Sequence, residues 1–474
     1  MMARSAVQTP ARSRGGLHVS ERKVLLVAAD LVLLNLALLA VLAWRMREPF
    51  AAATVASRAG WFALLSFIWA AVAALSEVYD LRRAARLPAG VVRPVTAVLV
   101  ADLLYLAVPY YTPYLHASRL TVLSFLAATA GLVAAWRTLY AVVLVQPSFR
   151  HPVLILGAGP AGREILSVMR AYGETEYLPV GFVDGDPALR GQEVDGIPVW
   201  GQARDLAAIL GRTDASEVVV ALPPSEGIDG DLFQTLVDCH ERGITVTPMY
   251  RLFEQLTGQV PIEHAGRNLS VVLPLDRTPP VIFDAVKRLL DLLLGAVGLA
   301  FMAVVTPLAA LALWLEDRGP AFYRQRRVGR GGREFVLLKF RTMTPDAEAT
   351  GPQWADVGDA RVTRVGRVLR RLHLDELPQA VNILRGEMSV VGPRPERPEF
   401  VAALQTVIPY YRTRLSVRPG VTGWAQVNFE YGDSVEDALV KLRYDLYYVK
   451  HRSMVLDLLI LIRTLGHVLR RGGR

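Results

Sequence analysis

Long apolar segments constrain the fold of this chain more than any other feature of its sequence. Four of them lie in the first third of the chain, near 24–43, 59–79, 94–113 and 120–145. Each approaches the roughly 20 residues that a helix needs to cross a bilayer. Lys and Arg precede the first segment, separate the second from the third and follow the fourth, so both ends of the group belong in the cytoplasm. The sequence therefore predicts a four-helix transmembrane bundle over 21–147, after a disordered cytoplasmic tail at 1–20.

A fifth apolar segment, at 292–315, is also long enough to span a bilayer. A straight span would put the basic stretch from Arg324 onward outside the cytoplasm, against the positive-inside rule. Thr306-Pro307 lies inside the segment, where proline removes a helical hydrogen bond and bends the axis. We therefore predict a re-entrant helix over 286–316 that breaks at this pair, dips into one leaflet and returns. A straight span is the alternative.

The stretch HPVLILGAGPAGREIL, at 151–166, reads as a short apolar strand, a glycine turn and the start of a helix. Gly157, Gly159 and Gly162 have the spacing of the dinucleotide fingerprint, in which a phosphate lies on backbone N–H groups at a helix N-terminus. Asp184 ends the next predicted strand, where a ribose-binding residue would fall. The four residues are candidate nucleotide-binding positions, although the glycines alone also fit a tight turn in a domain that binds nothing.

Two later apolar stretches, at 217–222 and 244–247, read as strands and alternate with helical patterns. This alternation predicts a Rossmann-like parallel α/β domain over 148–250. A proline-rich linker is expected to follow at 251–280.

Two adjacent carboxylates, Asp375 and Glu376, lie among clustered arginines and before a Pro-Arg-Pro segment that contains Arg394. Arginine suits phosphate oxygens because its planar fork of donors carries a permanent charge. Two carboxylates among arginines suit a divalent cation and a nucleophile, since phosphoryl transfer depends on positioning and charge neutralisation. From the residues alone, a solvated amphipathic helix with an Arg371–Asp375 ion pair is an equal alternative.

The net charge of +9 results from 53 Lys and Arg against 44 Asp and Glu. Such a charge fits anionic lipid or phosphorylated substrates. Nucleic acid is not an expected partner, because no nucleic-acid-binding module accompanies the charge. The single cysteine, Cys239, excludes a disulfide within the chain and favours a reducing compartment.

Six motifs follow one another in the last part of the chain: FYRQ at 322–325, KFRTM at 339–343, RVTRVGR at 361–367, LDELPQ at 374–379, GPRPE at 392–396 and RPGVTGWAQVN at 418–428. In these motifs and their order, this part of the chain resembles the catalytic domain of the bacterial sugar transferases, the monotopic polyprenol-phosphate phosphoglycosyl transferases. The resemblance implies a mostly helical catalytic domain over 281–474, with short strands and the re-entrant helix.

The family transfers a sugar 1-phosphate from a UDP-sugar to undecaprenyl phosphate and releases UMP. The resemblance therefore implies that Asp375 is the nucleophile, which forms a covalent phosphosugar intermediate, and that Glu376 helps to hold Mg²⁺. Four basic residues match the family's phosphate- and nucleotide-holding positions: Lys339, Arg341, Arg370 and Arg394.

The bundle and the α/β domain together resemble the N-terminal part of the long-form members, which carry a CoA-binding-type domain. This resemblance implies a multi-pass protein of the bacterial inner membrane, with both soluble domains in the cytoplasm. It also implies contact with membrane lipid, a homodimer and downstream glycosyltransferases as partners. A nucleotide in the Rossmann-like domain is a further expectation.

The sequence departs from the family pattern after Asn428, where Phe429-Glu430-Tyr431-Gly432 replaces a common Gly-Arg. The continuation is similar to a subgroup of exopolysaccharide systems, which leaves the sugar open between glucose, the first expectation, galactose and an N-acetylated diamino sugar. A nucleotide-sugar dehydratase is an alternative that would need a second glycine fingerprint and a Tyr-x-x-x-Lys pair, and Tyr444 has no such Lys. A non-catalytic scaffold is disfavoured because the acid pair and its basic residues are all present.

Overall fold

The computed structural model of the chain describes residues 19–46, 58–108, 112–113, 118–144, 150–174, 176–222, 229–266, 268–273, 281–344, 347, 359–429 and 434–471. Its contacts divide the chain into two units, Met1–Thr257 and Gly258–Arg474. The predicted tail at 1–20 lies outside the described residues except for its last two, which begin the first helix.

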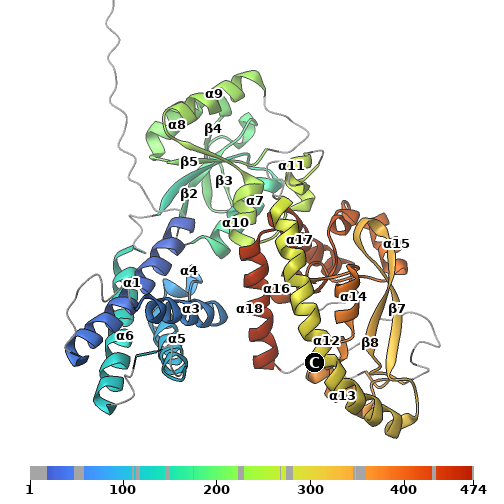
Figure 1. Ribbon diagram of the computed structural model, residues 1–474. Helices are drawn as coiled ribbons and strands as arrows, with labels where there is room; N and C mark the ends of the chain where they lie inside the picture. The colour runs from blue at the N-terminus through green and yellow to red at the C-terminus, as the bar shows by residue number, and fades with distance from the viewer. Residues whose placement is uncertain are drawn as a thin grey trace, which may run out of the picture. The chain divides into compact units, whose positions relative to one another are not determined.

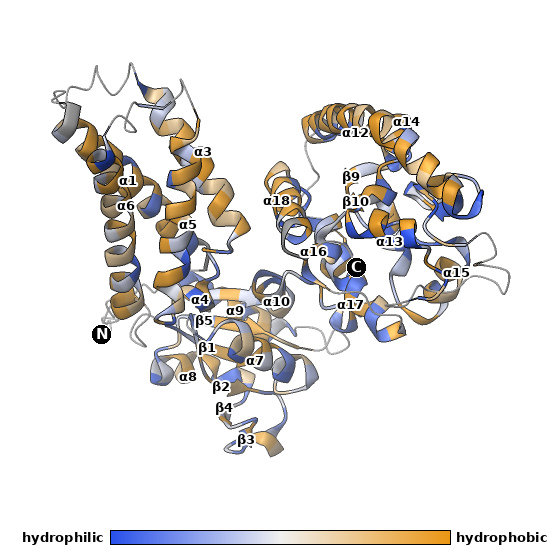
Figure 2. Cartoon of the chain, turned by 90° about the horizontal axis from the view of Figure 1, so that it is seen from below, coloured by the Kyte–Doolittle hydropathy of each residue, from blue (hydrophilic) through white to orange (hydrophobic). Residues whose placement is uncertain are grey.

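Apolar helices pack together in the first part of the first unit (Figure 1). They are α1 (Val19–Met46), α3 (Ala59–Leu75), the short α4 (Leu81–Ala84), α5 (Ala89–Leu106) and α6 (Arg119–Leu139), which continues as a π-helical turn, η2 (Tyr140–Leu144). Figure 2 shows how apolar these helices are along their length. Three of them (α1, α5 and α6 with η2) are long and apolar enough to cross a membrane, whereas α3 is shorter. The predicted helices are present, and their crossing of a membrane stays a prediction.

Two buried carboxylates join the helices of this group to one another. Asp30 of α1 forms an ion pair with Arg137 of α6, and both side chains are fully buried. Asp102 of α5 accepts a hydrogen bond from Thr129 of α6 at 2.6 Å. A buried polar group is tolerated when it is paired, so these contacts fix how the helices face one another.

The second part of this unit is a parallel sheet covered by helices on both faces. The sheet has the order β3-β4-β2-β1-β5-β6, and β3–β4 is its antiparallel pair. The strands are β1 (His151–Leu156), β2 (Tyr177–Val183), β3 (Glu193–Val194), β4 (Ile197–Gly201), β5 (Glu217–Val220) and β6 (Thr245–Pro248). The helices are α7 (Pro160–Tyr172), α8 (Leu206–Thr213), α9 (Gly230–Glu241) and α10 (Met249–Thr257). The predicted parallel α/β sheet is confirmed.

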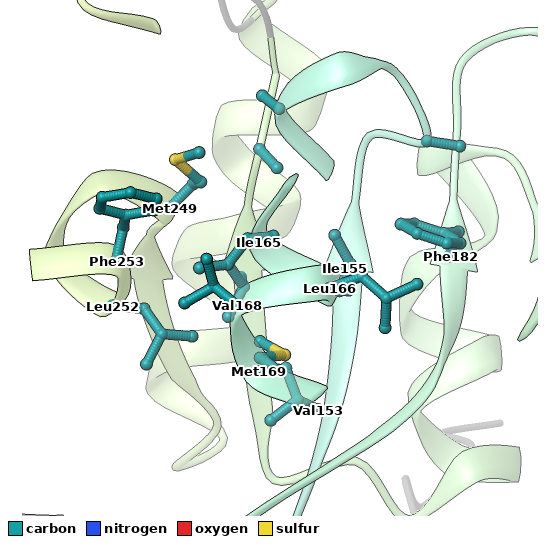
Figure 3. Packing of buried hydrophobic residues seen from close by; sticks show 14 of the residues in the cluster. Val153, Ile155, Ile165, Leu166, Val168, Met169, Phe182, Met249, Leu252 and Phe253 are labelled. Carbon is teal, nitrogen blue, oxygen red and sulfur yellow. The ribbon is translucent and has the colours of Figure 1, made fainter. Parts of the chain in front are cut away.

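Alternating side chains of β1 fill the two faces of this sheet, as the period of two in a strand requires. Val153 and Ile155 join a core built with α7 and α10, in which Ile165 and Phe253 are buried (Figure 3). Leu154 and Leu156 instead join a second core, built with α8 and α9. The short apolar run at the start of the glycine motif is therefore a central strand buried on both faces.

The second unit is mostly helical and contains two small sheets, in agreement with the predicted catalytic domain. It begins with η6 (Ile262–His264), α11 (Leu269–Val272), α12 (Val281–Asp317), β7 (Phe322–Val328) and β8 (Glu334–Phe340). It continues with α13 (Arg364–Arg371), η8 (Leu374–Glu376), α14 (Gln379–Arg385), β9 (Ser389–Val391) and α15 (Pro398–Val407). It ends with η9 (Tyr411–Ser416), β10 (Gly420–Thr422), α16 (Trp424–Asn428), α17 (Val435–His451) and α18 (Met454–Arg471). Strands β7 and β8 pair antiparallel, and β9 and β10 pair parallel.

Helix α12 carries the fifth apolar segment and is one continuous helix of 37 residues. In Figure 1 it changes direction before it reaches β7. The helix is therefore not interrupted at Thr306-Pro307, where a break was predicted. Proline removes one hydrogen bond at this point, and the helical turns on both sides of it continue. The helix is apolar enough to cross a membrane and is largely exposed, for example at Val304 (67%) and Leu308 (69%). Its re-entrant path stays a prediction.

The segment predicted as a linker, at 251–280, begins in α10 and continues into the second unit. The Trp424 indole N–H donates to the carbonyl of Gly258 at 2.8 Å, and the Lys450 ammonium donates to the carbonyl of Ser270 at 2.8 Å. This stretch is therefore attached to α16 and α17. Residues 274–280 lie outside the described part of the chain.

Candidate active site

The acid pair lies on a single turn between α13 and α14. His373 adopts the left-handed conformation (φ 54°), so α13 ends at Arg371 and Leu374–Glu376 form a separate 3₁₀ turn. The alternative of one amphipathic helix through 371–375 is therefore wrong, because a left-handed residue redirects the chain. Asp375 and Glu376 therefore both lie on this turn and not on either neighbouring helix.

Three separate segments meet at Glu376. Lys339 of β8 places its ammonium 3.0 Å from Glu376 Oε1, and Arg394, which follows β9, places Nη2 2.8 Å from the same oxygen. All three side chains are partly exposed, at 18% for Glu376, 19% for Lys339 and 26% for Arg394. A molecule in solution can therefore reach a carboxylate that two cations hold in place.

The two carboxylates have opposite electrostatic environments. Burial raises the pKa of Asp375, and the neighbouring negative charge of Glu376 adds to this effect against the opposing charge of Lys339. Burial would also raise the pKa of Glu376, but Arg394 and Lys339 hold that pKa well below its usual range. Over the described residues, the Asp375 carboxylate accepts no hydrogen bond. Glu376 is thus a fixed anion, and Asp375 is a more basic carboxylate that remains available for reaction.

Arg370 and Arg341, both predicted to bind substrate, have different surroundings. Arg370 donates from Nε to Thr342 Oγ1 at 2.9 Å. Burial lowers its pKa, and the negative charge of Asp375 opposes that shift. The guanidinium of Arg341 is instead buried against the Asp317 carboxylate, with Nη2 2.6 Å from Oδ1. The structure thus brings Lys339, Arg370 and Arg394 to the acid pair and uses Arg341 to hold the end of α12.

Sequence reasoning missed Glu316, which joins α12 to the helix before the acid pair. Its carboxylate accepts from the backbone N–H groups of Arg364, at 2.7 Å, and Val365, at 3.1 Å. A carboxylate at a helix N-terminus satisfies free N–H groups and complements the helix dipole. A sequence signal could not have found this contact, because the two segments are 48 residues apart.

The two carboxylates, with cations beside them, also limit which metal ion the site could bind. Within the described ranges, no group of three or more His, Cys, Asp or Glu side chains is placed to bind one metal ion. Mg²⁺ is commonly bound through one or two carboxylates together with substrate phosphates. Asp375 and Glu376 therefore fit Mg²⁺ as part of a complex with a phosphorylated substrate.

The predicted nucleotide site at the glycine turn has a packing explanation. Gly157 has φ of +107°, and a Cβ on Gly162 would lie 1.9 Å from the carbonyl oxygen of Gly157, whereas a Cβ on Gly159 would meet nothing within 4 Å. The Asp184 carboxylate accepts from the backbone N–H of Ala158 at 2.6 Å and thereby closes the turn. Two of the three glycines and the acid have structural roles, and nucleotide binding stays a prediction.

Comparisons with known proteins match both units. The family model for the bacterial sugar transferases matches residues 282–471, and that for a CoA-binding domain matches 74–229. The UDP-N-acetylgalactosamine-undecaprenyl-phosphate N-acetylgalactosaminephosphotransferase of Aeromonas hydrophila is 38% identical over 303 residues, which cover 63% of this chain and 68% of that protein. Proteins named UDP-glucose:undecaprenyl-phosphate glucose-1-phosphate transferase are also similar. The one from Xanthomonas campestris pv. campestris is 34% identical over 69% of this chain and 66% of its own. The one from Caulobacter vibrioides is 44% identical over 42% of this chain and 76% of its own.

Proposed function

Because this chain belongs to the bacterial sugar transferase family, we propose that it transfers a sugar 1-phosphate from a UDP-sugar to undecaprenyl phosphate and releases UMP. The observation that carries the proposal is the contrast within the acid pair. Glu376 is held by Lys339 and Arg394, whereas Asp375 lies beside the same cations and accepts no hydrogen bond in the described part of the chain.

In the proposed mechanism, an oxygen of the Asp375 carboxylate attacks the phosphorus that carries the sugar. The bond from that phosphorus to the bridging oxygen breaks, and its electron pair leaves with UMP. A phosphate oxygen of undecaprenyl phosphate then attacks the same phosphorus, and the Asp375 carboxylate leaves. The raised pKa of Asp375 favours this role, because a more basic carboxylate is a better nucleophile.

The basic residues would hold the phosphates while these bonds exchange. Lys339, Arg370 and Arg394 lie near the Asp375 carboxylate, and each can contact a phosphate oxygen there. Glu376 would help to hold Mg²⁺, which supplies neutralisation of the diphosphate charge when bound. Arg341 would act indirectly, since Asp317 occupies its guanidinium.

The apolar helices would bring the site to the lipid substrate. The exposed apolar side chains of α12, such as Val297 (68%) and Leu315 (69%), fit acyl chains better than water. In the proposed topology α12 is re-entrant, so that the catalytic domain and the α/β domain both face the cytoplasm of an inner membrane. A water-soluble donor and a long lipid would then meet at the membrane surface.

The donor sugar is proposed to be glucose, the sugar named in the transferases of Xanthomonas campestris and Caulobacter vibrioides. N-acetylgalactosamine is the second candidate, because the relative from Aeromonas hydrophila is named for it and is 38% identical over 303 residues. The product would then begin an exopolysaccharide repeat unit.

UMP release tests the proposal directly. The purified full-length protein in detergent with Mg²⁺ is given a panel of UDP-sugars, with and without undecaprenyl phosphate. We expect turnover with one sugar that depends on the lipid. Without lipid, mass spectrometry should find a sugar phosphate on the peptide that contains Asp375. The matched control is Glu399→Gln, which removes an exposed carboxylate on α15 and should leave turnover unchanged.

Two outcomes would contradict the proposal in different ways. Turnover that survives in Asp375→Asn would exclude this residue as the nucleophile. Folded protein that releases no UMP with any UDP-sugar would argue against the reaction itself and favour a non-catalytic scaffold.

A further inference from the structure

We infer that Arg414 is a positioning residue for the acid pair, because its buried guanidinium fixes the backbone from which Arg394 reaches Glu376. The inference rests on the proposed function for its catalytic meaning. The contacts that support it are independent of any substrate.

Arg394 lies in a segment that has no regular structure of its own. Residues 393–397, between β9 and α15, form neither helix nor strand. Pro393 and Pro395 flank Arg394 and have no backbone N–H to donate. The main-chain attachment of this segment therefore depends on its carbonyl groups, and the Glu396 carboxylate adds a side-chain ion pair with Lys441.

Four successive carbonyls in this segment each accept a hydrogen bond from a different residue. The donors are Gly420 N to Pro393 O, Arg414 Nη2 to Arg394 O, Arg327 Nη1 to Pro395 O and Val328 N to Glu396 O, each at 2.9 Å. Two of these donors are arginine side chains. Only the contact from Arg414 is to Arg394 itself.

The guanidinium of Arg414 is itself held in place by the Asp445 carboxylate. Its Nε and Nη2 lie 2.9 and 2.7 Å from Asp445 Oδ2. Arg414 is 3% exposed and Asp445 1% exposed. A buried pair of this kind leaves an uncompensated charge when one partner is removed. The pair is too deeply buried to bind a phosphate, so an effect of Arg414 on the reaction must pass through the residues that it contacts.

Arg414 binds the backbone carbonyl of Arg394, and the guanidinium at the far end of the Arg394 side chain contacts Glu376. Arg394 Nη2 is 2.8 Å from Glu376 Oε1, and the Arg394 carbonyl is 2.9 Å from Arg414 Nη2. A shift of the backbone at 394 would move the guanidinium away from Glu376. Misplacement by about 1 Å at a catalytic centre can lower the rate by about 100-fold.

A double-mutant cycle on UMP release, in the full-length protein in detergent, tests the inference. The proteins are wild type, Arg414→Met, Arg394→Gln and the double variant. We expect Arg414→Met to lower kcat by at least about 10-fold with a smaller change in KM. In the Arg394→Gln background the same change should cost less than about 2-fold, because the residue through which it acts is already gone.

Arg443→Met is the matched control. Its guanidinium lies 2.6 Å from Glu263, and none of its described side-chain contacts is with the segment 393–396. We expect the small effect of this change to be the same in the wild-type and Arg394→Gln backgrounds. If the effects of Arg414→Met and Arg394→Gln multiply as independent losses do, the inference is wrong.

Arg414→Lys covers the case in which Arg414→Met does not fold. A lysine keeps the charge opposite Asp445, but one ammonium cannot reproduce the planar fork that bridges two groups. We expect its Tm to stay close to that of wild type and its kcat to fall by about 5-fold or more. Wild-type kcat in a folded Arg414→Lys would overturn the inference. Absence of activity in wild type would instead contradict the proposed function.

Discussion

The acid pair and the glycine turn are both short sequence motifs, but they use their polar groups in different ways. At the glycine turn, Asp184 accepts a hydrogen bond from Ala158 N, and Gly162 lies too close to the carbonyl oxygen of Gly157 to admit a Cβ. At the acid pair, Glu376 is paired, while Asp375 accepts no hydrogen bond over the described residues, even though cations lie near it. Contacts within the protein account for two glycines and the acid of the turn, whereas no described hydrogen bond accounts for Asp375.

This difference separates a motif that is needed for folding from one that is available for chemistry. Contacts within the turn already explain two glycines and the acid, so they need no ligand to account for them. A half-buried carboxylate with a raised pKa is costly for folding, and such costs are concentrated at functional sites. Substitutions in the two regions should therefore affect different properties.

The largest expected effect is on activity. Asp375→Asn should lower UMP release by at least about 1,000-fold, because the amide is not a nucleophile toward phosphorus. The Tm should stay equal to that of wild type or rise, since the raised pKa shows that the folded protein disfavours this charge. Activity assays and thermal unfolding of the same preparation measure both. A large fall in Tm would mean that Asp375 is as structural as the glycine turn.

The second-largest effect is expected on stability, with the reaction itself retained. A Cβ at Gly162 would lie 1.9 Å from the backbone oxygen of Gly157, so Gly162→Ala must displace the turn and should destabilise the α/β domain by about 2–4 kcal/mol. Gly159→Ala is the control, because its Cβ would meet nothing within 4 Å. Thermal unfolding and limited proteolysis would report the change. Equal stability of the two variants would contradict the packing explanation and strengthen the case for a ligand.

The sequence predicted those parts of the fold that follow from local pattern. Alternating strands and helices predicted the parallel sheet, and the LDELPQ motif located the acid pair between basic residues. The role of Arg341 could not be predicted, because Arg341 follows β8 whereas its partner Asp317 is the last residue of α12. The same holds for Arg414, whose burial against Asp445 depends on the packing of η9 on α17. The left-handed turn at His373 had only a weak sequence signal, because histidine adopts this conformation more often than most residues but still uncommonly.

Glu176 is a second buried carboxylate whose pKa is raised, as that of Asp375 is, but it lies outside the acid pair. It is 3% exposed, and its Oε2 has no hydrogen-bond partner among the described residues. Burial raises its pKa to about 7 against the opposing charges of Arg22 and Lys23. It resembles Asp375 in its unfavourable charge but directly precedes β2, in the unit that does not contain the acid pair. An unfavourable charge alone would therefore not make it a catalytic residue.

Glu176→Gln is expected to give the smallest effect, and one that depends on pH. The pKa in the folded state lies above the ordinary value of 4.5, so the stability contributed by the protonated carboxyl is complete below about pH 4.5 and is lost as pH rises through about 7. The substitution should therefore raise the free energy of unfolding at pH 8 by at most about 3 kcal/mol. Thermal unfolding from pH 4 to 8 should show equal Tm values near pH 4 and a higher Tm for the variant at pH 8, with unchanged UMP release at the assay pH. A lower Tm for the variant at pH 8 would show that the ionised carboxylate stabilises the fold through Arg22 instead.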